Sequence, residues 1–259
     1  MTRTPLKSAI QCVAALLLLA AVSISAFEPP ADEVAKKPST YAPAKDLERQ
    51  FGEIIERVND SVSDEADYGT VQAKRMAKDA STIAALAFVL GNHDQQNKTK
   101  SSAGAIIKAA QQLTDDAEKY ADAKAAVAKL EKAIAATGQP ADATWSCVGD
   151  IEQLMKSVPL LTMSMRRAVR PTRFERTRDQ AAALSAALAA VFQVSMFDDT
   201  YCVDDADQKA WIDFCIRARD AASSCNSALG RGDQEAAFEG LEPLSQACDE
   251  CHERFRPKQ

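Results

Sequence analysis

The motif that most constrains this chain lies close to its C-terminal end, in the sequence Cys248-Asp249-Glu250-Cys251-His252. Two cysteines three positions apart, followed directly by a histidine, are the attachment signature of c-type haem. Each cysteine sulfur can add to one vinyl group of the porphyrin, and the histidine then serves as an axial ligand of the iron. If the motif is used in this way, the chain folds around one covalently held macrocycle. The rest of the sequence is therefore expected to form the walls of a haem pocket.

A CxxC pair has other uses, which the remaining sequence makes less favourable. A structural zinc site needs about four ligands, whereas the one other histidine is His93 and the other cysteines are scattered singly. A thioredoxin-type redox pair belongs to a βαβ context, and the chain has no convincing strand pattern. The third alternative is a CxxC pair on a helical face without a cofactor. Haem c is the favoured interpretation.

The N-terminal residues predict an export signal. Arg3 and Lys7 precede an apolar run over 13–22, and small residues follow up to Ala26. This pattern is typical of a cleaved signal peptide, here 1–26. The run is shorter than the roughly 20 residues that span a bilayer, although an uncleaved anchor remains an alternative. We therefore expect a periplasmic protein, in the compartment where thioether attachment of haem takes place.

The charge balance bears on partners. The formal net charge is −6 at pH 7, and no basic patch stands out from the mixed charge pattern. Nucleic acid is not expected as a partner, because binding to phosphate backbones depends on clustered Lys and Arg. An acidic surface could favour encounter with a basic redox partner protein, or it could serve solubility alone.

The chain is predicted to be all-helical. Its 9 glycines and 10 prolines are few for 259 residues, and apolar residues recur at spacings of three and four. Residues 27–45, rich in proline and charge, are expected to be a linker, and His93 is expected to be solvated in a polar loop. Helices are predicted over 46–58, 68–90, 101–136 (with Ser101 or Ser102 as N-cap), 148–169, 175–195, 207–229 and 233–256.

The last four of these predicted helices favour a four-helix bundle. Amphipathic helices joined by short loops pack as antiparallel neighbours, so 139–259 is expected to form an up-down-up-down bundle. Residues 46–138 contain no second CxxCH motif and are expected to form a haem-free helical domain. A single enlarged bundle is the alternative to this division.

The C-terminal half resembles the cytochrome c′ family. The resemblance covers roughly 147–259 and rests on the ending Cys248, Cys251, His252, Phe255, Arg256, which follows the pattern C-x-x-C-H-x-x-F-R. The sequence Ala210-Trp211-Ile212-Asp213-Phe214 and the turn Gly232-Asp233 are also similar to the family. The haem motif is specific, whereas the remaining likeness is a general bundle pattern.

The resemblance implies roles for several residues. His252 would be the proximal ligand of the haem iron, with Phe255 and Arg256 close to the macrocycle. High-spin members of the family leave the distal position vacant and can bind nitric oxide or carbon monoxide. Low-spin relatives place a methionine there. Met155 is the candidate here, because Gln153-Leu154-Met155-Lys156 resembles the corresponding first-helix segment. The alternatives are Met163 and Met165. Each of the three methionines could instead simply fill space in the hydrophobic core.

The other cysteines and the functional classes complete the expectations. Cys147 and Cys202 fall at the same end of the predicted bundle, so an oxidising compartment permits a disulfide between them. Cys215 and Cys225 are expected to be small buried hydrophobes. We expect electron transfer rather than enzymatic catalysis, because little remains to act as a general base. The alternatives are binding of a small gas and a mainly structural haem, and homodimerisation is left open.

Overall fold

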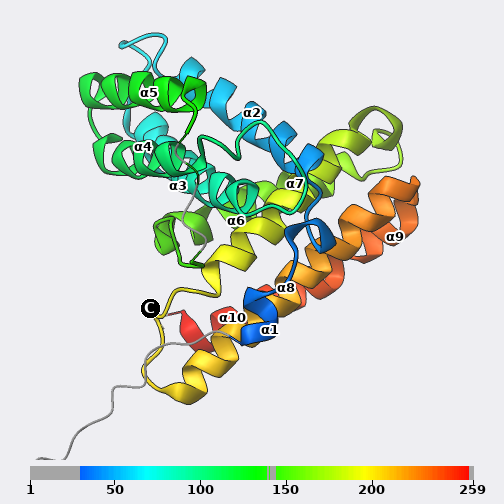
Figure 1. Cartoon of the computed structure of the whole chain (residues 1–259). Coiled ribbons are helices and arrows are strands. Elements are labelled where there is room, and N and C mark those ends of the chain that lie inside the picture. The colour runs from blue at the N-terminus through cyan, green and yellow to red at the C-terminus, as the bar shows by residue number, and fades with distance from the viewer. Residues whose placement is uncertain (1–29, 139, 141–143, 257–259) are drawn as a thin grey trace, which may run out of the picture.

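The computed structural model describes residues 30–138, 140 and 144–256, and within these ranges every regular element is a helix (Figure 1). The all-helical class predicted from the sequence is confirmed for this part of the chain. The predicted signal peptide lies outside the described residues. The helices are α1 (Ala31–Val34), the short 3-10 helix η1 (Pro38–Thr40), α2 (Ala44–Ser61), α3 (Thr70–Gly91), α4 (Ala103–Asp116), α5 (Tyr120–Ala135), α6 (Ile151–Ala168), α7 (Phe174–Ser195), α8 (Asp205–Arg231), α9 (Gln234–Glu239) and α10 (Leu241–Phe255).

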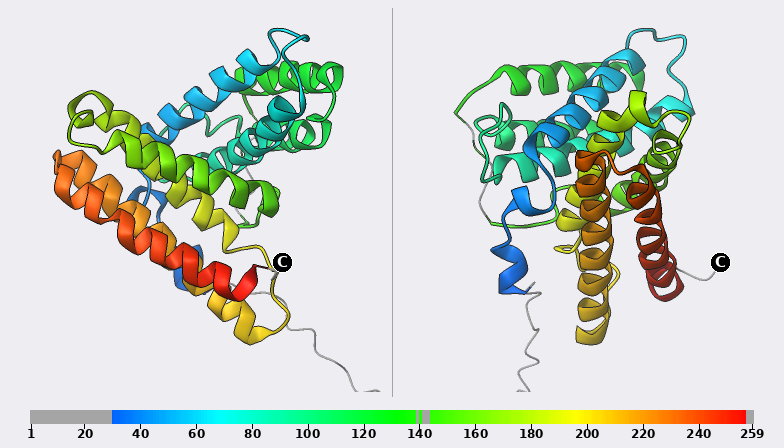
Figure 2. Two further views of the ribbon diagram at one scale, coloured as in Figure 1. Left: turned by 180° about the vertical axis from the view of Figure 1, so that it is seen from behind. Right: turned by 90° about the vertical axis from the view of Figure 1, so that its right-hand side faces the viewer.

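Two alanine-rich helices form the centre of the molecule. Residues 79–90 of α3 and 181–195 of α7 are buried on every side. Helix α7 packs against α2, α3, α6 and α8, while α3 also packs against α2, α4 and α6. A helix that is apolar all round is a buried helix, and alanine side chains let several neighbours approach at once. Helices α2 to α5 therefore gather on one side of α6 and α7, with α8 to α10 on the other (Figure 2).

One hydrophobic cluster runs through the helices of both halves. It includes Leu47 of α2, Leu113 of α4, Leu188 of α7 and Leu244 of α10. The sequence boundary near 139–147 thus separates two runs of helices along the chain without dividing their core. Among the residues that the structure describes, no helix is both long and apolar enough to cross a membrane.

The predicted helix 101–136 is interrupted. Helix α4 ends at Asp116, α5 begins at Tyr120, and the two pack against each other. The carbonyl of Ala117 accepts a hydrogen bond from the Tyr68 hydroxyl at 2.5 Å, a tertiary contact that holds the chain where it turns back. Ser102 does occupy the N-cap position of α4. Its hydroxyl, however, donates to the carbonyl of Thr99 at 3.3 Å and forms no capping bond.

The predicted helix 233–256 is also two helices, α9 and α10, which join at Gly240. A Cβ atom at this position would lie 2.6 Å from Sγ of Cys225 on α8. A side chain at this position would collide with the Cys225 thiol, and glycine avoids the collision because it has no Cβ atom. This contact brings the haem-motif helix against α8, and α10 then begins with Pro243 in its first turn.

The expected linker is in fact packed over its described part, 30–45, and the expected solvated histidine is buried. Tyr41 and Ala42 are buried, and His93 is completely enclosed. The His93 Nδ1 accepts a hydrogen bond from the Gln95 backbone N–H at 3.0 Å, which leaves the Nε2 proton to bond the Ala42 carbonyl at 2.9 Å. The prediction failed because this loop meets the segment before α2, a contact between residues 51 positions apart.

Candidate functional site

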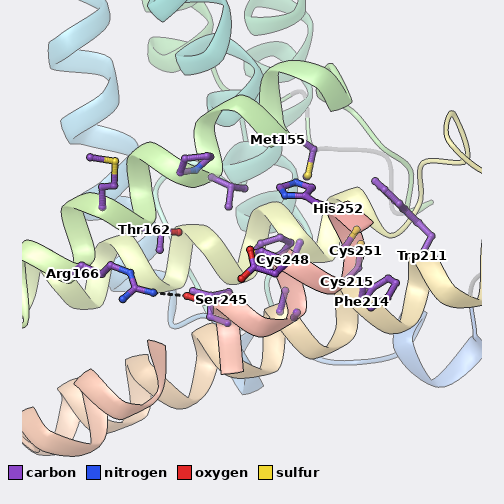
Figure 3. Close-up of a pocket in the computed structure, with 18 residues that line it drawn as sticks. Met155, Thr162, Arg166, Trp211, Phe214, Cys215, Ser245, Cys248, Cys251 and His252 are labelled. Atoms are coloured by element: carbon purple, nitrogen blue, oxygen red, sulfur yellow. Dashed lines mark hydrogen bonds between the residues drawn. The ribbon is translucent and has the colours of Figure 1, made fainter. Parts of the chain in front are cut away.

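An apolar cavity lies between α6 and α10. Helix α6 packs on α7, α7 on α8 and α8 on α10, whereas α6 and α10 form opposite sides of the opening. The cavity measures about 300 Å³, and the side chains that face it come from four helices (Figure 3). Its apolar wall consists of Met155, Val158, Pro159, Met163, Phe192, Trp211, Phe214, Ala218, Leu244 and Ala247.

The two cysteines of the CxxCH motif line this cavity together. Residues three apart on a helix lie on the same face, so Cys248 and Cys251 of α10 project one above the other (Figure 3). Both are partly buried. Burial raises the pKa of each thiol to about 11, with a further contribution from the neighbouring Asp249 or Cys248. At neutral pH both are therefore protonated thiols next to an apolar space.

His252 and Met155 face the same cavity from opposite helices. His252 is exposed at the mouth on α10, and Met155 is partly buried on α6 (Figure 3). Of the alternative methionines, Met163 lines the cavity at its exposed rim, whereas Met165 is fully buried in the core and does not. Pro159 lacks the amide hydrogen that would bond the carbonyl four residues earlier, so α6 is locally loosened beside Met155.

Two ion pairs hold α10 against α8. Arg217 contacts Glu250 at 2.7 Å, and Arg254 contacts Asp207 at 2.9 Å. The hydrogen bond from the partner arginine lowers the pKa of each carboxyl group below its usual value. Both pairs connect exposed faces, so their role is to fix the register of the motif helix rather than to add much stability.

Phe255 and Arg256 lie beside the cavity rather than on its wall. The ring of Phe255 meets the ring of Trp211 edge to face, with 5.3 Å between centroids. The Trp211 indole N–H in turn donates to the buried Ser195 carbonyl at 2.8 Å. Arg256 is exposed at the end of α10, where its backbone N–H bonds the His252 carbonyl at 3.1 Å. These aromatic contacts pack the C-terminal end of α10 against Trp211 of α8.

The predicted disulfide between Cys147 and Cys202 is not formed. Both cysteines are free, although both pack on the same small cluster around Trp211 and Cys215. The Cys147 thiol donates to the carbonyl of Gly149 in its own loop at 3.4 Å, and burial raises its pKa to about 12. Cys215 and Cys225 are buried, as predicted.

Three polar residues of the cavity were not anticipated. Arg166 donates a hydrogen bond to Oγ of Ser245, which joins α6 to α10 across one end of the opening (Figure 3). Thr162 also lines the cavity, and its buried hydroxyl has no hydrogen-bond partner. Met155, Pro159, Thr162 and Arg166 follow one another at spacings of four, three and four. Met155 was chosen from the resemblance of its segment to the cytochrome c′ family, and helical periodicity counted from Met155 could have found Thr162 and Arg166.

Within the described ranges, no three His, Cys, Asp or Glu side chains are grouped closely enough to hold a metal ion by themselves. The donor set instead fits a macrocycle with its own ring ligands: two thiols one turn apart, an imidazole next to them and a thioether opposite. No protein family model, curated protein or solved structure matches this chain.

Proposed function

We propose that this protein is a c-type haem protein that transfers electrons through one haem, attached to Cys248 and Cys251 and ligated by His252. The observation that carries the proposal is that both thiols and the imidazole line one apolar cavity between helices. When bound, the haem supplies a one-electron couple at its iron. The chain attaches the macrocycle, orients it between α6 and α10, and surrounds it with apolar side chains that limit contact with water.

The helix packing supports an arrangement of cytochrome c′ type. Helices α6, α7, α8 and α10 follow one another along the chain and pack in sequence, and their cavity lies between the first and the last. Cofactor sites of four-helix bundles lie between facing helices in this way. In our proposal α6 to α10 form the up-down-up-down bundle, and α2 to α5 cover its α6–α7 side.

Met155 is the proposed second axial ligand. Its thioether lies on the wall opposite the motif helix, and the other cavity-lining methionine, Met163, is at the exposed rim. With Met155 as ligand the chain presents a closed site whose geometry changes little between oxidation states, which suits electron transfer. If Met155 only fills space, the distal position is open, and the protein binds a small gas such as nitric oxide or carbon monoxide.

The partner chemistry differs from the expectation drawn from net charge. Six arginines at the α6–α7 connection are exposed, and none of them is paired with a carboxylate among the described residues. Arg166, the first of them, belongs to the rim of the cavity. An acidic redox partner in the periplasm therefore fits this edge, whereas the net charge alone left a basic partner and mere solubility open. The residues are Arg166, Arg167, Arg170, Arg173, Arg176 and Arg178.

The test is an optical spectrum of the full chain produced with haem-maturation machinery. An alkaline pyridine spectrum should report thioether-linked haem. Cys248→Ala/Cys251→Ala should lose it, while the matched control Cys215→Ala, a cysteine of the same cavity outside the motif, should keep it. The absence of covalent haem from the unmodified chain would overturn the proposal.

The same sample decides between the two distal sites. A low-spin spectrum that ignores carbon monoxide in the native chain and responds to it in Met155→Ala supports electron transfer with Met155 as ligand. A high-spin spectrum that shifts with the gas in the native chain supports the open site.

A further inference from the structure

One end of the cavity is basic and polar, in contrast to its apolar wall. Arg166 of α6 and Ser245 of α10 meet there, one to two helical turns from the motif cysteines (Figure 3). The Ser245 hydroxyl donates to the carbonyl of Leu241 at 3.0 Å and accepts from the Arg166 guanidinium. Its orientation is therefore fixed by two bonds, and it holds Arg166 at the rim.

Arg166 has unused hydrogen-bonding capacity. A guanidinium carries five N–H donors, and Ser245 is the one partner found for it among the described residues. No carboxylate within the described ranges forms an ion pair with Arg166. Asp249 also lines the cavity, and it is exposed and not bonded to the arginine. The positive charge at this end is thus available to a ligand.

Thr162 supplies an independent observation that points to a ligand. Its hydroxyl is buried within the cavity lining, one turn before Arg166, and has no hydrogen-bond partner. Leaving such a group unsatisfied costs free energy, which a bound acceptor oxygen would recover. Thr162 and Arg166 lie four positions apart on one face of α6, so one acceptor group can reach both.

We propose that Thr162, Arg166 and Ser245 form a carboxylate-binding subsite that orients the pocket's ligand. The proposal rests on the proposed function in one respect: the carboxylate is a propionate of the haem attached at the other end. Arginine is suited to this task because its planar fork matches a carboxylate with two parallel hydrogen bonds. The thioethers fix one edge of the macrocycle, and the subsite fixes the edge that bears the acid groups.

The test separates recognition of the acid groups from attachment. The full chain with Cys248→Ala/Cys251→Ala, which cannot form thioethers, is titrated with haemin and with haemin dimethyl ester, whose acid groups are neutral. We expect haemin to bind more tightly than the ester. Adding Arg166→Gln should weaken haemin binding by at least about tenfold, because the charge-assisted pair of hydrogen bonds is lost, and leave ester binding unchanged. Thr162→Val should reduce haemin binding by a smaller factor in the same direction.

Arg167→Gln is the matched control, because Arg167 is an exposed neighbour on α6 that does not line the cavity. It removes the same charge and should leave both affinities unchanged. Equal binding of haemin and ester, or equal effects of the two arginine variants, would overturn the subsite while leaving the haem proposal intact. If neither porphyrin binds and the unmodified chain also fails to acquire covalent haem, the proposed function fails as well, and the subsite with it.

Discussion

The helices before and after the 139–147 boundary are built from similar sequence but enclose different interiors. Each group contains a long alanine-rich helix that is buried on every side, α3 in the first and α7 in the second. In the first group the facing positions are filled with apolar side chains such as Ile106, Ala110 and Leu113 of α4. In the second, α6 and α10 face each other across the apolar cavity, and Arg166 of α6 bonds Ser245 of α10 at one end of it. The same helical pattern thus gives a packed contact between α3 and α4 or an apolar cavity between α6 and α10, according to a few positions on one face.

Helices α6 and α4 differ in how they begin. Asp150 accepts a hydrogen bond from the first turn of α6 at 2.8 Å, and Asp204 and Asp233 do the same for α8 and α9 at 2.8 and 3.1 Å. Helices α2, α4, α5, α7 and α10 start without a side-chain cap. A side-chain cap stabilises a helix end by satisfying one of its free N–H groups, and α4 lacks this local contribution.

The largest expected effect comes from breaking the link between the N-terminal segment and the second group. Arg219 of α8 is completely buried, and it bonds Glu33 of α1, the Gln193 amide oxygen and the half-exposed carboxylate of Asp220. Removing Glu33 takes away the buried carboxylate partner and leaves the half-exposed Asp220 to compensate the charge, so the expected cost is about 3 kcal/mol, the lower end for a broken buried pair. Glu33→Ala should lower the free energy of unfolding by this amount in urea titrations. Lys36→Ala removes a partly buried charge that pairs with Glu33 at the longer distance of 3.4 Å, and it should have a much smaller effect because Arg219 keeps its carboxylate partner. Equal effects of the two changes would contradict the structure.

The ion pair between Glu33 and Arg219 makes the stability of the folded chain depend on pH. Burial alone would raise the pKa of Glu33, but the hydrogen bond and charge of Arg219 outweigh it, so the pKa lies below the ordinary 4.5. A carboxyl group with a lowered folded-state pKa contributes stability above its unfolded pKa and loses it as the pH falls through the folded value. Acidification below about 4.5 should therefore destabilise the native chain more than Glu33→Gln. If the free energy of unfolding fell equally with pH in the native chain and in Glu33→Gln, this explanation would be wrong.

Two truncations compare the stability contributed by a side chain in the buried core with that of a side chain on the cavity wall. Leu113 is fully buried in α4, and a leucine-to-alanine change at such a site costs about 2–5 kcal/mol. Met155 is partly buried on the cavity wall, so Met155→Ala should cost at most about 1 kcal/mol in the haem-free chain. Urea unfolding of Cys248→Ala/Cys251→Ala with each change added provides the comparison. A larger cost at Met155 would mean that the cavity is filled when haem is absent.

The sequence predicted those parts of the fold that depend on local pattern. Apolar spacing located α2, α3, α6, α7 and α8 to within a few residues, because amphipathic stripes are set by neighbours along one helix. The interruption of 101–136 was missed because it depends on Tyr68, which is distant in the chain. The break at Gly240 was missed because it reflects close contact with Cys225.

The candidate site was likewise predictable where it depends on local sequence pattern, and not where it depends on contacts between distant residues. Cys248, Cys251 and His252 are defined by spacing, and Met155, which was chosen from the family resemblance, lies on the same cavity wall. The importance of Arg166 depends on Ser245, 79 residues later, and a contact of this kind is not visible in a local pattern. The burial of His93 and the packing of residues 31–42 are of the same kind.

The reactivity of the Cys248 and Cys251 thiols tests whether they face the apolar cavity. Burial raises the pKa of Cys248 and Cys251 from 9.0 to about 11. Because only the thiolate reacts, at pH 8 these cysteines should alkylate about 100-fold more slowly than ordinary thiols. Iodoacetamide labelling of the haem-free chain, followed by mass spectrometry of the C-terminal peptide, measures this rate. Labelling in urea is the control and should restore the ordinary rate. Equal rates in the folded and unfolded chain would place both thiols in solvent and contradict the apolar cavity.

The smallest effect concerns the caps. Asp150→Ala removes the bond to the Gln153 N–H and should destabilise the protein by about 1 kcal/mol. Asp150→Asn keeps an acceptor oxygen and should cost much less. Ser102→Ala, at the corresponding position of α4, should cost only a few tenths of a kcal/mol, because its hydroxyl bonds Thr99 rather than the helix N–H groups. Equal losses of unfolding free energy for Asp150→Ala and Ser102→Ala would show that local capping does not distinguish α6 from α4. Since Met155 lies in the second turn of α6, fraying by Asp150→Ala should also increase the fraction of haem protein that binds carbon monoxide, whereas Ser102→Ala should not.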